Sequence, residues 1–188
     1  MSKDINRSKL IILENAKEYL SDVEYKELDE HLSQNDIGLK SFQSHGPKAS
    51  LNDINIFISE NITQLLIAGI LMPVIYDVIK KSLKIVIYKI RDKVKIIQSG
   101  KIREAVPCLT FKTKNGEIKA PIPTDLSEEQ FERYMDEIKS AMESIKINPK
   151  TRYESYVIEK SKNSLKVEAK TMLQYAHEQH QNQKKKKQ

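Results

Sequence analysis

The chain has 188 residues, a length that suits one compact domain or one domain with an extension. Charged residues make up 31% and hydrophobic residues 39%, so the composition is polar and globular and excludes a fully disordered chain. A single cysteine excludes an internal disulfide framework and a multi-cysteine zinc site, and it favours a reducing compartment.

The positive charge is concentrated in two places. The formal net charge is +6, and residues 184–187 supply four of these charges. Residues 80–103 carry nine basic groups against Asp92 alone, whereas residues 1–53 are net negative. This basic stripe is able to steer an anionic partner, and it is equally typical of a solvated helix face.

The first third of the chain predicts a strand, a helix and a loop. Residues 9–13 are apolar and predict a first strand or the start of a helix. Ser21 and Glu24 have the spacing of a capping box, which predicts a helix over about 22–33. Residues 38–52 are rich in glycine and serine and indicate a loop, or a weak strand followed by a loop.

The segment 54–91 is the dominant feature. Its first half is apolar nearly all round, which predicts a helix buried on all sides. Pro73 lies inside it and costs about 3 kcal/mol in a helix interior, so we expect a kink or a break there, with Pro73 as a possible start of a second helix. Residues 74–91 are amphipathic, with the lysines away from the apolar face.

Twelve residues within this segment, 65–76, carry no charge. A membrane-spanning helix needs about 20 apolar residues, so the length favours a buried core helix. An apolar block followed by a basic amphipathic helix also suits insertion at a membrane surface, which is the alternative.

A hairpin and a second helix follow. Asn115-Gly116 predicts the turn of a hairpin within 106–123, after a linker near Ser99-Gly100. Ser127 with Gln130 forms a second capping box and predicts an amphipathic helix over about 128–146.

The sequence therefore predicts an α+β fold, in which a small antiparallel sheet packs on a buried central helix (62–90) and on the second amphipathic helix. Residues 1–147 are expected to form this single domain. Residues 148–183 predict an appendage with a short strand over 151–160 and a polar helix over 163–180, and residues 184–188 predict a disordered lysine tail.

Catalytic, cofactor and metal motifs are not evident. His177 and His180 are three apart, which differs from the spacing of the zinc-protease helix, and no third ligand is apparent. Cys108 has no histidine near it in sequence and predicts a packed core residue. The five glycines are scattered, so no phosphate-binding loop is formed. We expect no catalytic residues, no cofactor and no metal.

The order of parts resembles a known family. An apolar N-terminal segment, an acidic helix and Gly46-Pro47 are followed by an apolar helical block with Gly69, a basic amphipathic helix, a hairpin on residues 114–116 and the helix start TDLSEEQF. Over about residues 9–145 this is similar to the bacterial effector-associated constant component family. The resemblance implies a non-enzymatic adaptor that assembles with an effector in anti-phage conflict systems, with no catalytic residues to carry over.

The function that we expect is therefore a cytoplasmic bacterial adaptor without catalysis, which binds a protein partner and forms a homo-oligomer. Its interface is expected to use the apolar helix 62–79 or the basic continuation of that helix. The predicted partner-binding residues are Lys80, Lys81, Lys84, Lys89, Arg91 and Lys93. The alternatives are a membrane-active effector that inserts residues 65–76, and a nucleic-acid-binding protein that uses the basic stripe 80–103.

Overall fold

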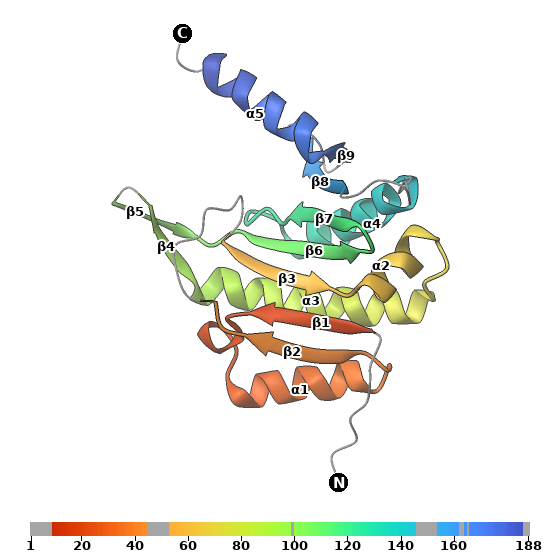
Figure 1. Cartoon of the computed structure of the whole chain (residues 1–188). Helices are drawn as coiled ribbons and strands as arrows, with labels where there is room; N and C mark the ends of the chain where they lie inside the picture. The colour runs from red at the N-terminus through yellow and green to blue at the C-terminus, as the bar shows by residue number, and fades with distance from the viewer. Residues whose placement is uncertain are drawn as a thin grey trace.

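The computed structural model describes residues 9–44, 53–98, 100–145, 154–161, 164 and 166–185, which form a seven-stranded sheet with helices packed on it (Figure 1). The strands of the sheet are β1 (Leu10–Glu14), β2 (Gly38–Phe42), β3 (Ile54–Ile58), β6 (Pro107–Thr113), β7 (Gly116–Pro121), β8 (Glu154–Lys160) and β9 (Val167–Thr171). A separate hairpin contains β4 (Lys95–Gln98) and β5 (Lys101–Glu104). The helices are η1 (Ala16–Glu18), α1 (Asp22–Ser33), α2 (Glu60–Ile67), α3 (Pro73–Lys93), α4 (Glu128–Ser144) and α5 (Met172–Lys185).

The sheet is mixed, with the order β2-β1-β3-β6-β7-β8-β9. The pairs β1–β2, β3–β6 and β7–β8 are parallel, and the other three pairs are antiparallel. Each parallel pair is joined by a connection that contains a helix, as parallel pairing requires. The α+β class is confirmed, but the predicted small antiparallel sheet is wrong, because these helical connections return the chain in a parallel direction.

The first part of the apolar segment 54–91 is a strand and not a helix. Ile54, Ile56 and Ile58 of β3 are at most 1% exposed, whereas Asn55 and Phe57 between them are half-buried. Such alternation is the pattern of a strand that buries one face, and β-branched isoleucines favour it.

The predicted break at proline is confirmed. α2 ends at Ile67, and Pro73 is the first residue of α3, where its missing N–H needs no helical partner. The single buried helix 62–90 is therefore wrong: two helices replace it, and they are joined by a turn.

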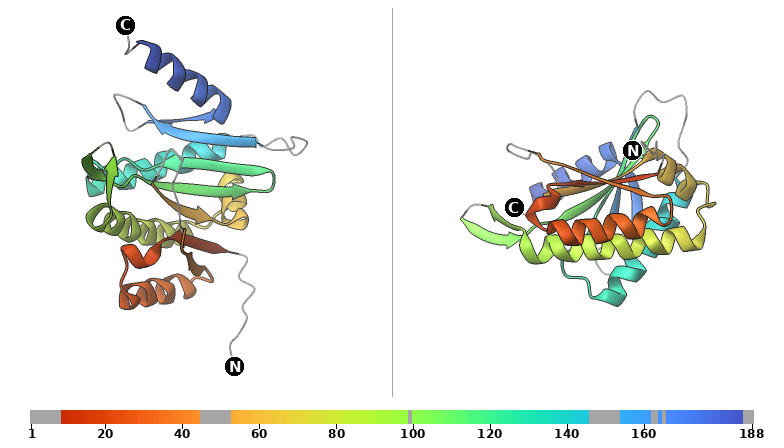
Figure 2. Two further views of the ribbon diagram at one scale, coloured as in Figure 1. Left: turned by 60° about the vertical axis from the view of Figure 1, so that its left-hand side comes forward. Right: turned by 90° about the horizontal axis from the view of Figure 1, so that it is seen from below.

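One face of the sheet carries the main core. Helices α1, α3 and α4 all lie on that face, as the view from below shows (Figure 2). Leu13 of β1, Leu83 of α3 and Phe131 of α4 are each at most 1% exposed and belong to a single hydrophobic cluster. The other face of the sheet lies toward the viewer in Figure 1, and none of the described helices crosses β1, β3 or β6 there.

Local helix and hairpin signals are reproduced with small shifts. Both capping boxes are present, Ser21 with Glu24 and Ser127 with Gln130, at the starts of α1 and α4. The β6–β7 hairpin is confirmed, but Thr113 pairs with Gly116, so the turn lies one residue earlier than predicted.

The described part of residues 154–185 continues the sheet. β8 pairs with β7, and β9 pairs with β8, so both strands belong to the same sheet as the first part of the chain. The predicted polar helix begins only at Met172, because residues 167–171 form β9. α5 projects from these two strands (Figure 1) and continues through Lys185, so two residues of the predicted disordered tail are helical. Residues 186–188 lie outside the described residues.

Candidate partner-binding surfaces

The first lysines of the predicted basic stripe pair with acidic residues of α4. The Nζ atom of Lys80 lies 3.1 Å from carboxylate oxygens of both Glu132 and Asp136. The Nζ atom of Lys84 lies 2.9 Å from an oxygen of Glu128. Burial alone would lower the pKa of Lys80, but the hydrogen bonds to Glu132 and Asp136 raise its pKa overall. These charges fasten α3 to α4.

The next lysines pair with the start of α1. Lys89 donates a hydrogen bond to Glu24, and the Nζ atom of Lys93 lies 3.5 Å from the same carboxylate. The hydrogen bond from Lys89, helped by those from Ser21, lowers the pKa of Glu24 to about 2. The acidic side chain near the N-terminus of α1 is thereby tied to the C-terminal part of α3.

Arg91 is also engaged within the molecule. Its Nη1 atom donates to the carbonyl oxygen of Leu126 at 3.2 Å, and its guanidinium carbon lies 4.9 Å from the ring centroid of Tyr88. Lys81 is exposed and has no ion-pair partner among the residues that the structure describes. Five of the six predicted partner-binding residues thus have intramolecular contacts. Their role in partner binding stays a prediction, and these contacts leave little unpaired charge for it.

The apolar segment 65–76 is buried only in part. Leu66, Leu71 and Tyr76 are at most 6% exposed. By contrast, Ile70 is 66%, Met72 60% and Val74 68% exposed. We call these three exposed residues the apolar turn. For them the predicted burial is wrong, because Ile70 and Met72 occupy the reversal between two helices and Val74 lies in the first turn of α3 beside it.

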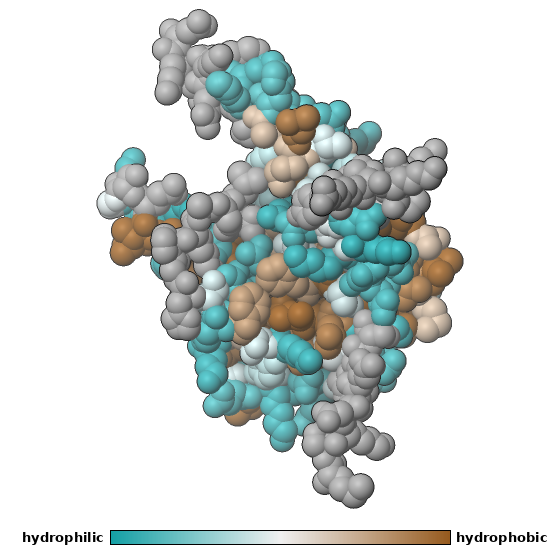
Figure 3. Space-filling view, viewed as in Figure 1, coloured by the Kyte–Doolittle hydropathy of each residue, from teal (hydrophilic) through white to brown (hydrophobic). Residues whose placement is uncertain are grey.

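The end of α2 explains this exposure. Gly69 has a positive φ of 66° and follows the helix, a conformation that L-residues rarely adopt. The N–H of Ile70 donates to the carbonyl oxygen of Leu65 at 3.1 Å, and the N–H of Gly69 donates to that of Leu66 at 3.0 Å, which together form a Schellman motif. The chain reverses here, and the turn forms an apolar edge of the molecule beside α2 (Figure 3).

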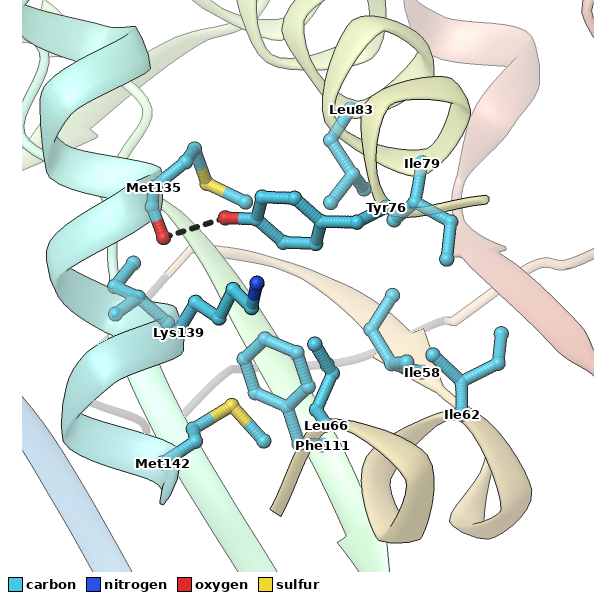
Figure 4. A pocket seen from close by; sticks show the side chains of 11 residues that line it. Ile58, Ile62, Leu66, Tyr76, Ile79, Leu83, Phe111, Met135, Lys139 and Met142 are labelled. Atoms are coloured by element: carbon cyan, nitrogen blue, oxygen red, sulfur yellow. Dashed lines mark hydrogen bonds between the residues drawn. The ribbon is translucent and has the colours of Figure 1, made fainter. Parts of the chain in front are cut away.

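A small apolar cavity lies between α2, α3, α4 and the sheet (Figure 4). The hydroxyl of Tyr76 donates to the carbonyl oxygen of Met135 at 2.7 Å, and the Nζ atom of Lys139 lies 5.0 Å from the Tyr76 ring centroid. The open space measures about 10 Å³, the room of one water molecule. It is a gap in the packing and too small to bind an organic ligand.

The β4–β5 hairpin, which we call the arm, forms a second apolar surface. It extends from the body beyond the end of α3 (Figure 1). Ile97 and Ile102 are directly opposite each other, and they are 76% and 73% exposed. Few large hydrophobic side chains in the described residues are as exposed as this pair.

The face of the sheet opposite the main core carries a third apolar area, around Ile12, Phe42 and Phe57 (Figure 3). The two phenylalanine ring centroids are 5.9 Å apart, and the Nζ atom of Lys112 lies 4.9 Å from the ring centroid of Phe57. Phe42 is 42% exposed, while Ile12 and Phe57 are half-buried. This area is less exposed than the apolar turn and the arm.

In the described part of the chain, the residues with catalytic or metal-binding potential are not assembled into a site. Cys108 is fully buried, and burial raises the pKa of its thiol to about 12, so it is not a thiolate at neutral pH. The Nε2 atom of His177 lies 2.8 Å from the side-chain nitrogen of Gln181, so this histidine contacts a neighbour on its own helix. Within the described ranges, no group of three or more His, Cys, Asp or Glu side chains is placed to hold a metal ion.

None of the helices in the described part of the chain combines the length and the apolar character needed to cross a bilayer.

Fold and surfaces together describe an α+β protein with a mixed sheet, internally paired charges and two strongly exposed apolar features. Comparisons with protein-family models, with curated proteins and with solved structures find no match to this chain.

Sequence reasoning offered the apolar helix 62–79 as an interface but missed the exposure of its turn, and it missed the arm. For the turn, a signal was present: a glycine at 69 and a proline at 73 are the usual stop and start of two helices. For the arm, the signal was two short runs with β-branched residues on either side of Ser99-Gly100.

Proposed function

We propose that this chain is a non-catalytic adaptor, cytoplasmic and bacterial, that docks an effector partner through the apolar turn. The observation that carries the proposal is the exposure of Ile70, Met72 and Val74, each 60% or more, within a few residues of one another. Exposed apolar residues that cluster mark interaction sites, whereas isolated ones are normal on any surface.

Electrostatics at the turn favours a protein partner. The nearest exposed charge after the turn is Asp77, and no lysine lies within residues 61–76. Interface centres are depleted in charge and enriched in methionine and aromatic residues, which this turn matches with Met72. The resemblance to effector-associated adaptors supports the same assignment.

A membrane surface is the second candidate partner, and the same exposed turn favours it. Against it, anionic headgroups attract lysine and arginine, and Asp77 would repel them. The attraction would come from the six basic residues of α3 between positions 80 and 93, and most of these form ion pairs within the molecule. A nucleic-acid partner loses support for the same reason.

The experiment that tests the proposal compares two sites in the native host. A photo-crosslinking amino acid is placed at Met72, and a matched one at Ile85, which is 50% exposed on α3 but outside the turn. We expect one specific protein to be captured from Met72 and not from Ile85. The captured protein is then purified for binding measurements.

The binding measurement uses Ile70→Asp with Val74→Asp, and Ile85→Asp as the control. Truncation or polar replacement of a central apolar residue costs about 1–2 kcal/mol, so the double variant should bind at least about tenfold more weakly. Affinity equal to that of the wild type would contradict the proposal. Binding of the wild type to anionic vesicles in flotation, lost in Ile70→Asp, would instead assign the turn to a membrane.

A further inference from the structure

The arm has two faces that differ in their contacts with the body. On the inner face, Ile96 is half-buried against the hydrophobic core. Arg103, on the same face, donates two hydrogen bonds to the Asp53 carboxylate, at 2.6 and 2.9 Å. These contacts hold the inner face toward the body. The outer face contacts the body at the base of the arm, where the Nζ atom of Lys95 donates to the carbonyl oxygen of Arg91 at 3.0 Å, and further along the arm it presents two isoleucines that are more than 70% exposed.

The outer face carries four residues in two cross-strand pairs. Ile97 lies opposite Ile102, and Lys95 lies opposite Glu104, with 3.8 Å between the charged atoms. Lys95 and Glu104 are each 46% exposed. Along the arm, the cation of β4 therefore lies beside the anion of β5, and the isoleucine of β4 lies beside the isoleucine of β5.

A two-stranded ribbon is marginal in water without further packing on an apolar face. Ile97 and Ile102 present such a face at more than 70% exposure with nothing packed on it among the described residues. Covering this isoleucine pair would remove apolar surface from water, which is favourable by about 25 cal/mol per Å².

We propose that the outer face of the arm binds the outer face of the same arm in a second copy of this chain, related by a two-fold axis that runs along the arm. Such an axis places β4 of one copy over β5 of the other. Ile97 then meets the partner's Ile102, and Lys95 meets the partner's Glu104. The two sheets would stack about 10 Å apart, and each body lies on the inner side of its own arm, away from the interface.

The arrangement of Lys95 and Glu104 on the outer face favours a second copy of this chain as the partner. A foreign protein would need its own apolar pair and its own matching acid and base, whereas this face carries its complement within itself. A bilayer or a nucleic acid would not use the anion Glu104. This inference uses a different surface from the proposed effector site, so either one is able to fail without the other.

The first test is the mass in solution as the concentration rises, measured by light scattering or sedimentation. We expect the wild type to rise from 21.8 kDa toward twice that value, and Ile97→Ser with Ile102→Ser to stay at 21.8 kDa. Ile85→Ser, which changes an exposed isoleucine on α3, should associate like the wild type. A wild type that remains monomeric at its highest soluble concentration overturns the proposal, and so does a dimer that survives the double variant.

The second test separates pairing between copies from pairing within one arm. Lys95→Glu gives an outer face with two anions, and Glu104→Lys gives one with two cations, so each variant alone should fail to dimerise. Mixed together, they should form a heterodimer, because both anions of one copy then face both cations of the other. If the mixture stays monomeric while the wild type dimerises, the two-fold arrangement is wrong. Circular dichroism of each variant confirms that the body remains folded.

Discussion

Two adjacent parts of the chain, the apolar turn and the basic stripe on α3, differ in how fully the rest of the molecule covers them. The charged side chains of Lys80 and Lys84 are 14% and 24% exposed and lie against acids of α4. The apolar side chains of Ile70 and Val74 are 66% and 68% exposed. Here the charges are the more enclosed groups, and the apolar residues face solvent.

The reason is the position of each part relative to its neighbours. α3 runs between α1 and α4. Lys80 in the first half of α3 pairs with Glu132 of α4, and Lys89 in its second half pairs with Glu24 of α1. The turn lies beyond the end of the helical layer, where no described element covers it (Figure 1). Neighbours supplied by the fold decide whether a residue is available to a partner, and residue type alone does not.

The largest expected effect contrasts a buried and an exposed aliphatic residue of this region. Leu83→Ala should lower the free energy of unfolding by about 2–5 kcal/mol, because Leu83 is 1% exposed and its loss leaves a cavity. Ile70→Ala should change it by no more than about 0.5 kcal/mol. Urea unfolding measures both. A comparable loss in the two variants would show that the turn is packed and not available for docking.

A second contrast concerns two tyrosine hydroxyls of α3. The hydroxyl of Tyr76 donates to the carbonyl oxygen of Met135 at 2.7 Å, so Tyr76→Phe should cost about 1 kcal/mol. The hydroxyl of Tyr88 is buried and has no hydrogen-bond partner among the described residues. Tyr88→Phe should therefore be neutral or stabilising. Thermal unfolding of the pair measures this, and an equal loss would mean that Tyr88 has a partner in solution.

Sequence reasoning succeeded where the signal is local. The capping boxes at Ser21 and Ser127 act over three residues, and they located the starts of α1 and α4. Pro73 predicted the break between α2 and α3 for a similarly local reason. By contrast, residues 54–58 are apolar enough to suit a buried helix or a buried strand, and only pairing with β1 and β6 decides between them.

The candidate sites were less predictable because they depend on distant residues. Lys80 is 56 residues from Asp136 in sequence, so its pairing is invisible until α4 is placed beside α3. The parallel pairing of β7 with β8 likewise requires the chain to return after α4. Exposure of Met72 depends on the absence of a covering element among those described, which no pattern of its own neighbours reveals.

A smaller effect is expected from the charges of α3. Lys80→Met should cost up to about 1 kcal/mol, because it removes two ion pairs whose lysine is 14% exposed and leaves two acids close together. Lys81→Met, one residue along the helix, should cost close to nothing. Urea unfolding in low salt compares the two variants. Equal stability of both would show that the stripe does not fasten α3 to α4 and is free to bind a partner.

The smallest effect depends on pH and concerns Glu24. Its pKa in the folded state is about 2, against an ordinary value of 4.5, so the folded state favours the charged form. The stabilisation is therefore complete above about pH 4.5 and is lost as the pH falls toward 2. Glu24→Gln removes the charge but retains a residue that suits the capping box with Ser21.

Unfolding in urea from about pH 7 to about pH 3 measures this effect as the difference in stability between the wild type and Glu24→Gln. The difference should be constant at the upper end and should shrink below about pH 4.5. Glu27→Gln on the same helix is the control, because Glu27 is exposed and has no ion-pair partner among the described residues. A difference that is flat with pH would mean that Lys89 does not hold Glu24. The C-terminal end of α3 would then present free lysines beside the arm, and the contrast between a paired stripe and an unpaired turn would apply only to the α4 side.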